Sequence, residues 1–131
     1  MSIRTKAVLA AVSATLVAGT GAALAAPTGT FTGPSTTTAP YVLPAADGVS
    51  TESLLTVGDS GSAGNGYEMV GIPDGLGAYR ERGSRDFTLL MNQELNSSVG
   101  VTRRHGAKGA FISEYSVDPD TFEIEDGKDM I

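Results

Sequence analysis

The chain has 131 residues, with 9 lysine and arginine residues against 15 aspartate and glutamate residues, which gives a formal net charge of −6. It contains no cysteine, which excludes a disulfide framework and lipid attachment through an N-terminal cysteine. The acidic balance argues against a nucleic-acid-binding protein, because neutralising phosphates requires clustered lysine and arginine.

The first 25 residues are predicted to be a secretory signal peptide. Arg4 and Lys6 form a short positive region, the apolar run AVLAAVSATLVAG follows, and Ala23-Leu24-Ala25 supplies the small residues that signal peptidase needs before Ala26. The apolar run is shorter than the roughly 20 residues that span a bilayer. We therefore expect a secreted, periplasmic or extracellular protein that has no membrane association after cleavage.

Residues 26–44 are predicted to form a disordered leader. This segment is rich in threonine, proline and glycine, has no charged residue and shows no periodic apolar face. Residues 45–131 then form the predicted folded part. It opens with a possible strand at residues 52–57, followed by a glycine- and serine-rich loop at residues 58–66.

From Tyr67 onward, short apolar runs alternate with turn residues. The run YEMVGI, residues 67–72, is a candidate strand ended by the turn tripeptide Pro73-Asp74-Gly75. The runs LGAYR and DFTLLMN flank ERGS, residues 81–84, in which Gly83 can adopt a positive φ. This pattern predicts a β-hairpin.

A second hairpin is predicted further along the chain. The run AFISEYSV, residues 110–117, alternates so that its odd-numbered residues share one face. DPDT, residues 118–121, has proline at the second position of a type I turn, and FEIE, residues 122–125, returns as a short partner strand. No window from Tyr67 onward has sustained helical periodicity, so the predicted class is all-β, built of antiparallel hairpins.

A few short hairpins leave sheet edges and one sheet face without partners. Domains of this size are marginally stable without a metal, a disulfide or a partner. Successive hairpins are also typical of β-propeller blades, and one or two blades cannot close a ring. Because the sequence stops at GKDMI directly after a hairpin, we expect the first one or two blades of an incomplete propeller.

The end of the run FTLLMNQEL, residues 87–95, is a candidate metal site. Asn92, Gln93 and Glu94 follow the apolar residues. Carboxylate and amide oxygens at a strand end suit a hard cation such as calcium, which takes six to eight oxygens. The alternative is a solvated glutamate at the surface, since one carboxylate does not make a site.

The run RRHGAKG, residues 103–109, is a candidate anion-binding loop. Arg104, His105 and Lys108 lie among flexible glycines beside a predicted strand and could bind a phosphate, although a solvated loop is the simpler interpretation. The single histidine has no cysteine or second histidine to complete a zinc site. The G-x-S-x-G nucleophile motif is absent, so the catalytic residues are unknown.

The chain resembles the N-terminal part of the bacterial PhoX-like phosphatase family in four ordered runs: YEMVGIPDGLGAY, FTLLMNQEL, GVTRRHGAKGAFISEYSVD and GKDMI. The resemblance covers residues 41–131 and implies an exported β-propeller that hydrolyses phosphomonoesters with calcium and iron at its axis. The family run similar to MNQEL usually reads Asn-His-Glu, with the glutamate at the metal centre. The resemblance thus makes Glu94 the leading ligand candidate and Asn92 a weaker one, with Gln93 in place of the histidine.

These expectations describe an N-terminal portion of a metal-dependent phosphatase whose full-length relatives act on a phosphate ester. The family's other ligands would lie beyond Ile131, so we expect no hydrolysis by these 131 residues alone. Calcium and iron are implied by the resemblance only, and this portion need not hold either. One alternative is a small secreted all-β binding module without catalysis, and another is a family member that binds carbohydrate or a surface.

Overall fold

The computed structural model describes residues 28–59 and 61–131, so the predicted signal peptide lies outside the described residues. The described part contains strands and no α-helix, which confirms the predicted all-β class. No helix able to cross a membrane occurs in these residues. The strands are β1 (Gly29–Thr32), β2 (Ser50–Ser53), β3 (Pro73–Tyr79), β4 (Phe87–Gln93), β5 (Phe111–Val117) and β6 (Ile124–Asp129).

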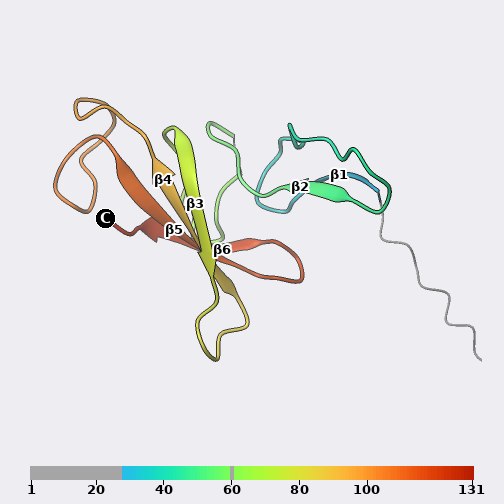
Figure 1. Ribbon diagram of the computed structural model, residues 1–131. Coiled ribbons are helices and arrows are strands. Elements are labelled where there is room, and N and C mark those ends of the chain that lie inside the picture. The colour runs from blue at the N-terminus through green and yellow to red at the C-terminus, as the bar shows by residue number, and fades with distance from the viewer. Residues whose placement is uncertain (1–27, 60) are drawn as a thin grey trace, which may run out of the picture.

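The strands form two sheets (Figure 1). β3, β4, β5 and β6 make an open antiparallel sheet in sequential order, and β1 pairs with β2 in parallel. Both predicted hairpins are present in the larger sheet. In the turn between β3 and β4, Gly83 has a φ of 90°, and the backbone N–H of Ser84 donates to the carbonyl of Glu81 at 3.1 Å.

The predicted strand at residues 67–72 is wrong. These residues are not a strand, and β3 instead occupies Pro73–Tyr79, which includes the tripeptide predicted as a turn. The apolar character of residues 67–72 reflects packing, because Met69 is buried in the core and Tyr67 packs against it. A shift in the β3–β4 register between Pro73 and Leu76 allows the Pro-Asp-Gly tripeptide to lie in an edge strand.

Two other predicted strand positions differ from the structure. The strand expected at residues 52–57 lies at Ser50–Ser53. β6 begins at Ile124 and not at Phe122, because the turn before it extends further than its sequence indicates. Phe122 has a φ of 57°, and its N–H donates to the carbonyl of Asp118 at 2.9 Å.

The prediction of a disordered leader at residues 26–44 is also wrong within the described part. Gly29–Thr32 form β1, and the following turn is fixed by contacts with residues far along the chain. Ser35 is buried, and its Oγ accepts a hydrogen bond from the N–H of Ile124 at 2.9 Å. Threonines 36–38 all hydrogen-bond the carboxylate of Asp59. Composition alone does not reveal such non-local partners.

The core covers one face of the four-stranded sheet. β5 alternates between buried and partly exposed residues, and its buried face contains the odd-numbered residues that the sequence predicted. Segment 61–69 lies against this face and brings Ala63 and Met69 into the core. The remaining buried apolar residues of this cluster come from three neighbouring strands: Met91, Tyr115, Val117 and Ile124.

Candidate functional site

Candidate functional side chains lie at both ends of the four-stranded sheet. The predicted metal ligands lie at the end of β4 that is next to the start of β5, with Asn92 in the strand and Glu94 directly after it. An acidic group that the sequence analysis did not assemble lies at the opposite end, where β4 begins and β5 ends. The two sets therefore cannot form one site.

Glu94 is placed at the end of β4, as predicted. Its backbone N–H donates to the carbonyl of Ile72 at 2.8 Å, which adds one hydrogen bond beyond the end of the β3–β4 ladder. The residue is exposed. Asn92 lies opposite Ile112 in the β4–β5 register. Alternate residues of an extended chain point to the same side, so Asn92 and Glu94 present their oxygens on one side of β4.

Gln93 points the other way, into the protein. It is 0% exposed, and neither atom of its side-chain amide has a hydrogen-bond partner among the described residues. Gly71 lies directly over it, since a Cβ added at Gly71 would be 3.1 Å from Gln93 Oε1. Gln93 is thus a buried neighbour of Asn92 and Glu94.

The predicted anion-binding residues are all exposed in the loop between β4 and β5: Arg104, His105 and Lys108. A tight turn folds this loop, because the N–H of Gly106 donates to the carbonyl of Arg103 at 2.9 Å. The guanidinium of Arg104 donates to the backbone carbonyl of Asp129 at 3.5 Å. Phosphate binding by these three residues stays a prediction.

Arg103, the remaining cation of this loop, has a structural role. Its guanidinium carbon lies 4.2 Å from the centroid of the Phe111 ring, and its Nη1 lies 3.3 Å from Asp129 Oδ1. The same carboxylate oxygen accepts a hydrogen bond from the hydroxyl of Tyr67 at 2.6 Å. Burial, with the bond to Asp129, raises the pKa of Tyr67 far above its usual value. This network ties the loop to β6 and to segment 61–69.

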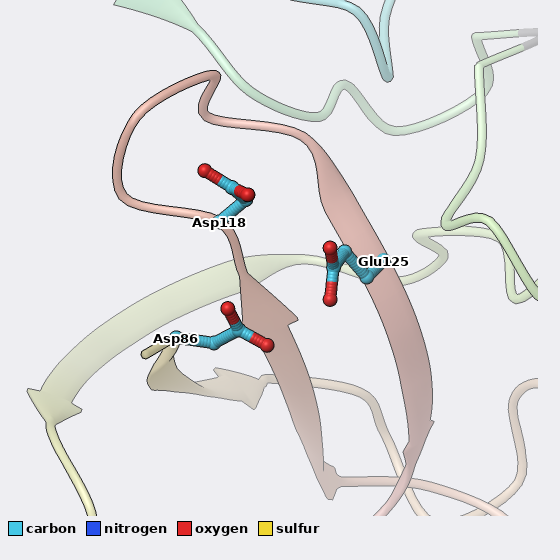
Figure 2. A group of neighbouring side chains, drawn as sticks. All are labelled: Asp86, Asp118 and Glu125. Carbon is cyan, nitrogen blue, oxygen red and sulfur yellow. The ribbon is translucent and has the colours of Figure 1, made fainter. Parts of the chain in front are cut away.

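The acidic group consists of Asp86, Asp118 and Glu125, which each offer a carboxylate oxygen within 4.8 Å of the others. Their side chains point toward a common space between the start of β4, the end of β5 and the start of β6 (Figure 2). The sequence shows an acidic run around β6 but does not place Asp86 beside it. The pairing of Phe87 with Val117 places Asp86 beside Asp118. The sequence analysis missed this group because it did not establish the strand register.

Neighbouring groups set the charges of this cluster. Backbone N–H groups of Asp120 and Thr121 donate to Asp118 at 2.7 and 3.1 Å, and they lower its pKa together with Arg85 at 3.1 Å. Asp86 raises the pKa of Glu125 through a hydrogen bond and through its negative charge. Arg85 therefore balances part of the negative charge of this cluster. Acidic groups of this kind are common without an ion.

No protein-family model matches the chain, and neither a curated protein nor a solved structure matches it. The PhoX-like resemblance therefore stays a prediction.

Proposed function

We propose that the β3–β6 sheet is one blade of a β-propeller in an exported, metal-dependent phosphatase of the PhoX-like kind. The observation that carries this proposal is the strand order. Four consecutive strands form an antiparallel sheet in sequential order, as propeller blades do. Strands β4 and β5 lie within two of the runs on which the resemblance depends. The complete propeller would hydrolyse a phosphomonoester.

Glu94 is the contribution of this blade to the metal centre. Its carboxylate is exposed just beyond a strand whose register is fixed on both sides by β3 and β5. Asn92 offers an amide oxygen on the same side of the strand. A ligand in or directly after a paired strand is held more precisely than one in the middle of a loop, which suits a metal centre assembled from several blades.

The residues of this chain do not by themselves fit a calcium or iron centre. Glu94 and Asn92 together supply two carboxylate oxygens and one amide oxygen, whereas calcium takes six to eight oxygens. Within the described residues, Glu94 belongs to no group of three ligating side chains. Hydrolysis of a phosphate ester also needs several positive charges converging on the phosphate. We therefore expect no turnover by this chain alone.

A calcium titration followed by calorimetry tests the role of Glu94. We expect weak binding, with a Kd at or above the roughly millimolar range of low-affinity extracellular calcium sites. Glu94→Gln should weaken this binding further because it removes the only charged ligand. Glu68→Gln changes another exposed glutamate, outside the strands, and serves as the matched control. With calcium and iron(III) present, p-nitrophenyl phosphate should not be hydrolysed above the buffer rate.

Three results would contradict the proposal. Calcium binding that is the same in the native chain and in Glu94→Gln would remove Glu94 from the site. Binding that is lost in Asp86→Asn instead would place the ion at the acidic group. Sustained hydrolysis of p-nitrophenyl phosphate would show that the chain needs no further blades.

A further inference from the structure

The two edges of the four-stranded sheet differ in how their backbone groups are bonded. On the outer side of β6, Ile124 donates to Ser35 Oγ at 2.9 Å and accepts from the N–H of Gly64 at 2.8 Å. The amide side chain of Asn65 bonds both backbone groups of Gly127, at 2.8 and 3.3 Å. Residues from outside the sheet thus cap β6, which protects this edge from pairing with another chain.

The edge at β3 has no such cap. All seven residues of β3 are exposed, and among the described residues no hydrogen bond joins β3 to any segment except β4. The regular part of the strand, Leu76–Tyr79, carries no charge, and its two large side chains are 64% and 45% exposed. An uncharged edge with free backbone groups is a template for another strand.

We propose that a second copy of this chain pairs with β3 in antiparallel orientation, about a two-fold axis through Gly77. Residues directly opposite each other in such a pair share one face of the sheet. Leu76 then faces the small Ala78 of the second copy. Tyr79 faces Gly75 and covers the backbone that this edge glycine leaves open. The result is one continuous eight-stranded sheet.

Charge complementarity favours a second copy as the occupant. Asp74 lies in the irregular first part of β3 and Arg80 directly after the strand. Continued past the regular part of β3, the same register brings Asp74 of each copy near Arg80 of the other, and the two-fold symmetry forms this pair twice. The Nε of Arg80 donates to the carbonyl of Ser84 at 2.8 Å, which holds the arginine near the end of β3. The pairing uses an edge of the proposed blade but not Glu94, so the charge exchanges at β3 and the calcium titration at Glu94 test the two proposals separately.

Charge exchange tests this pairing by sedimentation velocity of the exported chain over a range of concentrations. Asp74→Arg and Arg80→Asp should each raise the dimer Kd about tenfold, because each turns two attractive pairs into repulsive ones. The double variant restores both pairs with reversed signs and should return the Kd to near its native value. A loss of strand structure would not show this recovery.

Single cysteines test the register, since the native chain has none. Gly77 lies opposite itself across the axis, so Gly77→Cys should form an intermolecular disulfide under mild oxidation much faster than Ala78→Cys. A chain that stays monomeric at every concentration would overturn the proposal. So would a dimer that neither responds to the charge exchanges nor links at position 77.

Discussion

Asp59 shows how one carboxylate fixes a segment whose composition predicts disorder. It accepts a hydrogen bond from the backbone N–H of Thr37 at 2.6 Å and further bonds from the hydroxyls of threonines 36–38. These bonds, led by that of the Thr36 hydroxyl, hold the pKa of Asp59 well below its usual value of 3.8. The ionised form therefore stabilises the fold.

Replacing Asp59 with asparagine should lower the stability of the protein at neutral pH. Because the pKa is depressed in the folded state, the contribution of Asp59 is present above its usual pKa and is lost as the pH falls toward the lower folded value. Urea unfolding at a series of acidic pH values should show a flatter pH dependence in Asp59→Asn than in the native chain. The exposed Asp47→Asn is the control and should keep the native dependence.

Gly127 is required by a close contact in the core. A Cβ at this position would lie 2.6 Å from the Cδ1 of Tyr67, whose ring crosses β6 there. We expect Gly127→Ala to destabilise the fold by about 1–3 kcal/mol, as overpacking does in other cores. Gly77→Ala places its Cβ in open space and should be nearly neutral in urea unfolding at low protein concentration. Equal effects at the two positions would contradict this packing.

Among the elements, the two hairpins could be predicted because the sequence features that indicate them lie within the hairpins themselves. Alternation marks β5, and turn residues such as Gly83 mark the connections. The strand predicted at residues 67–72 failed because a short apolar run does not distinguish a strand from a segment that packs over a sheet. β1 was missed because its pairing with Ser50–Ser53 joins residues about twenty positions apart, which local propensity does not report.

Asn65 provides a test of the β6 edge at the scale of one element. Its side chain replaces the hydrogen bonds that a fifth strand would make with Gly127. Asn65→Ala should lower the free energy of unfolding by about 1–3 kcal/mol, because it leaves partly buried backbone groups without partners. The Gly127 amide should also exchange with solvent faster. Asn96→Ala, at an exposed loop position, is the control, and matching losses in both variants would contradict the capping role.

For the candidate site, the sequence located single residues but not their companions. The position of Glu94 at a strand end follows from the apolar run before it. The burial of Gln93 depends on which face Gly71 covers, and the acidic group depends on the register that sets Phe87 against Val117. Both are properties of the assembled sheet. A short motif therefore indicates which residue could be a ligand, but it does not indicate which residues lie next to that residue in the folded protein.

For the molecule as a whole, the asymmetry of the sheet matters most. One face is covered, one edge is capped, and the edge at β3 is open. A propeller blade and a strand-pairing module share these features, so the fold alone suits both functions predicted from the sequence. Calcium binding at Glu94 and Asn92 would distinguish the two, because only a metal-dependent propeller requires it.

The most direct measurement is a calcium titration of the isotope-labelled chain, followed by NMR through its backbone amide signals. The account predicts progressive shifts centred on Asn92 and Glu94, which disappear in Glu94→Gln and persist in Glu68→Gln. Shifts confined to Asp86, Asp118 and Glu125, or shifts at Asn92 and Glu94 that persist unchanged in Glu94→Gln, would contradict the assignment of Glu94 as a metal ligand.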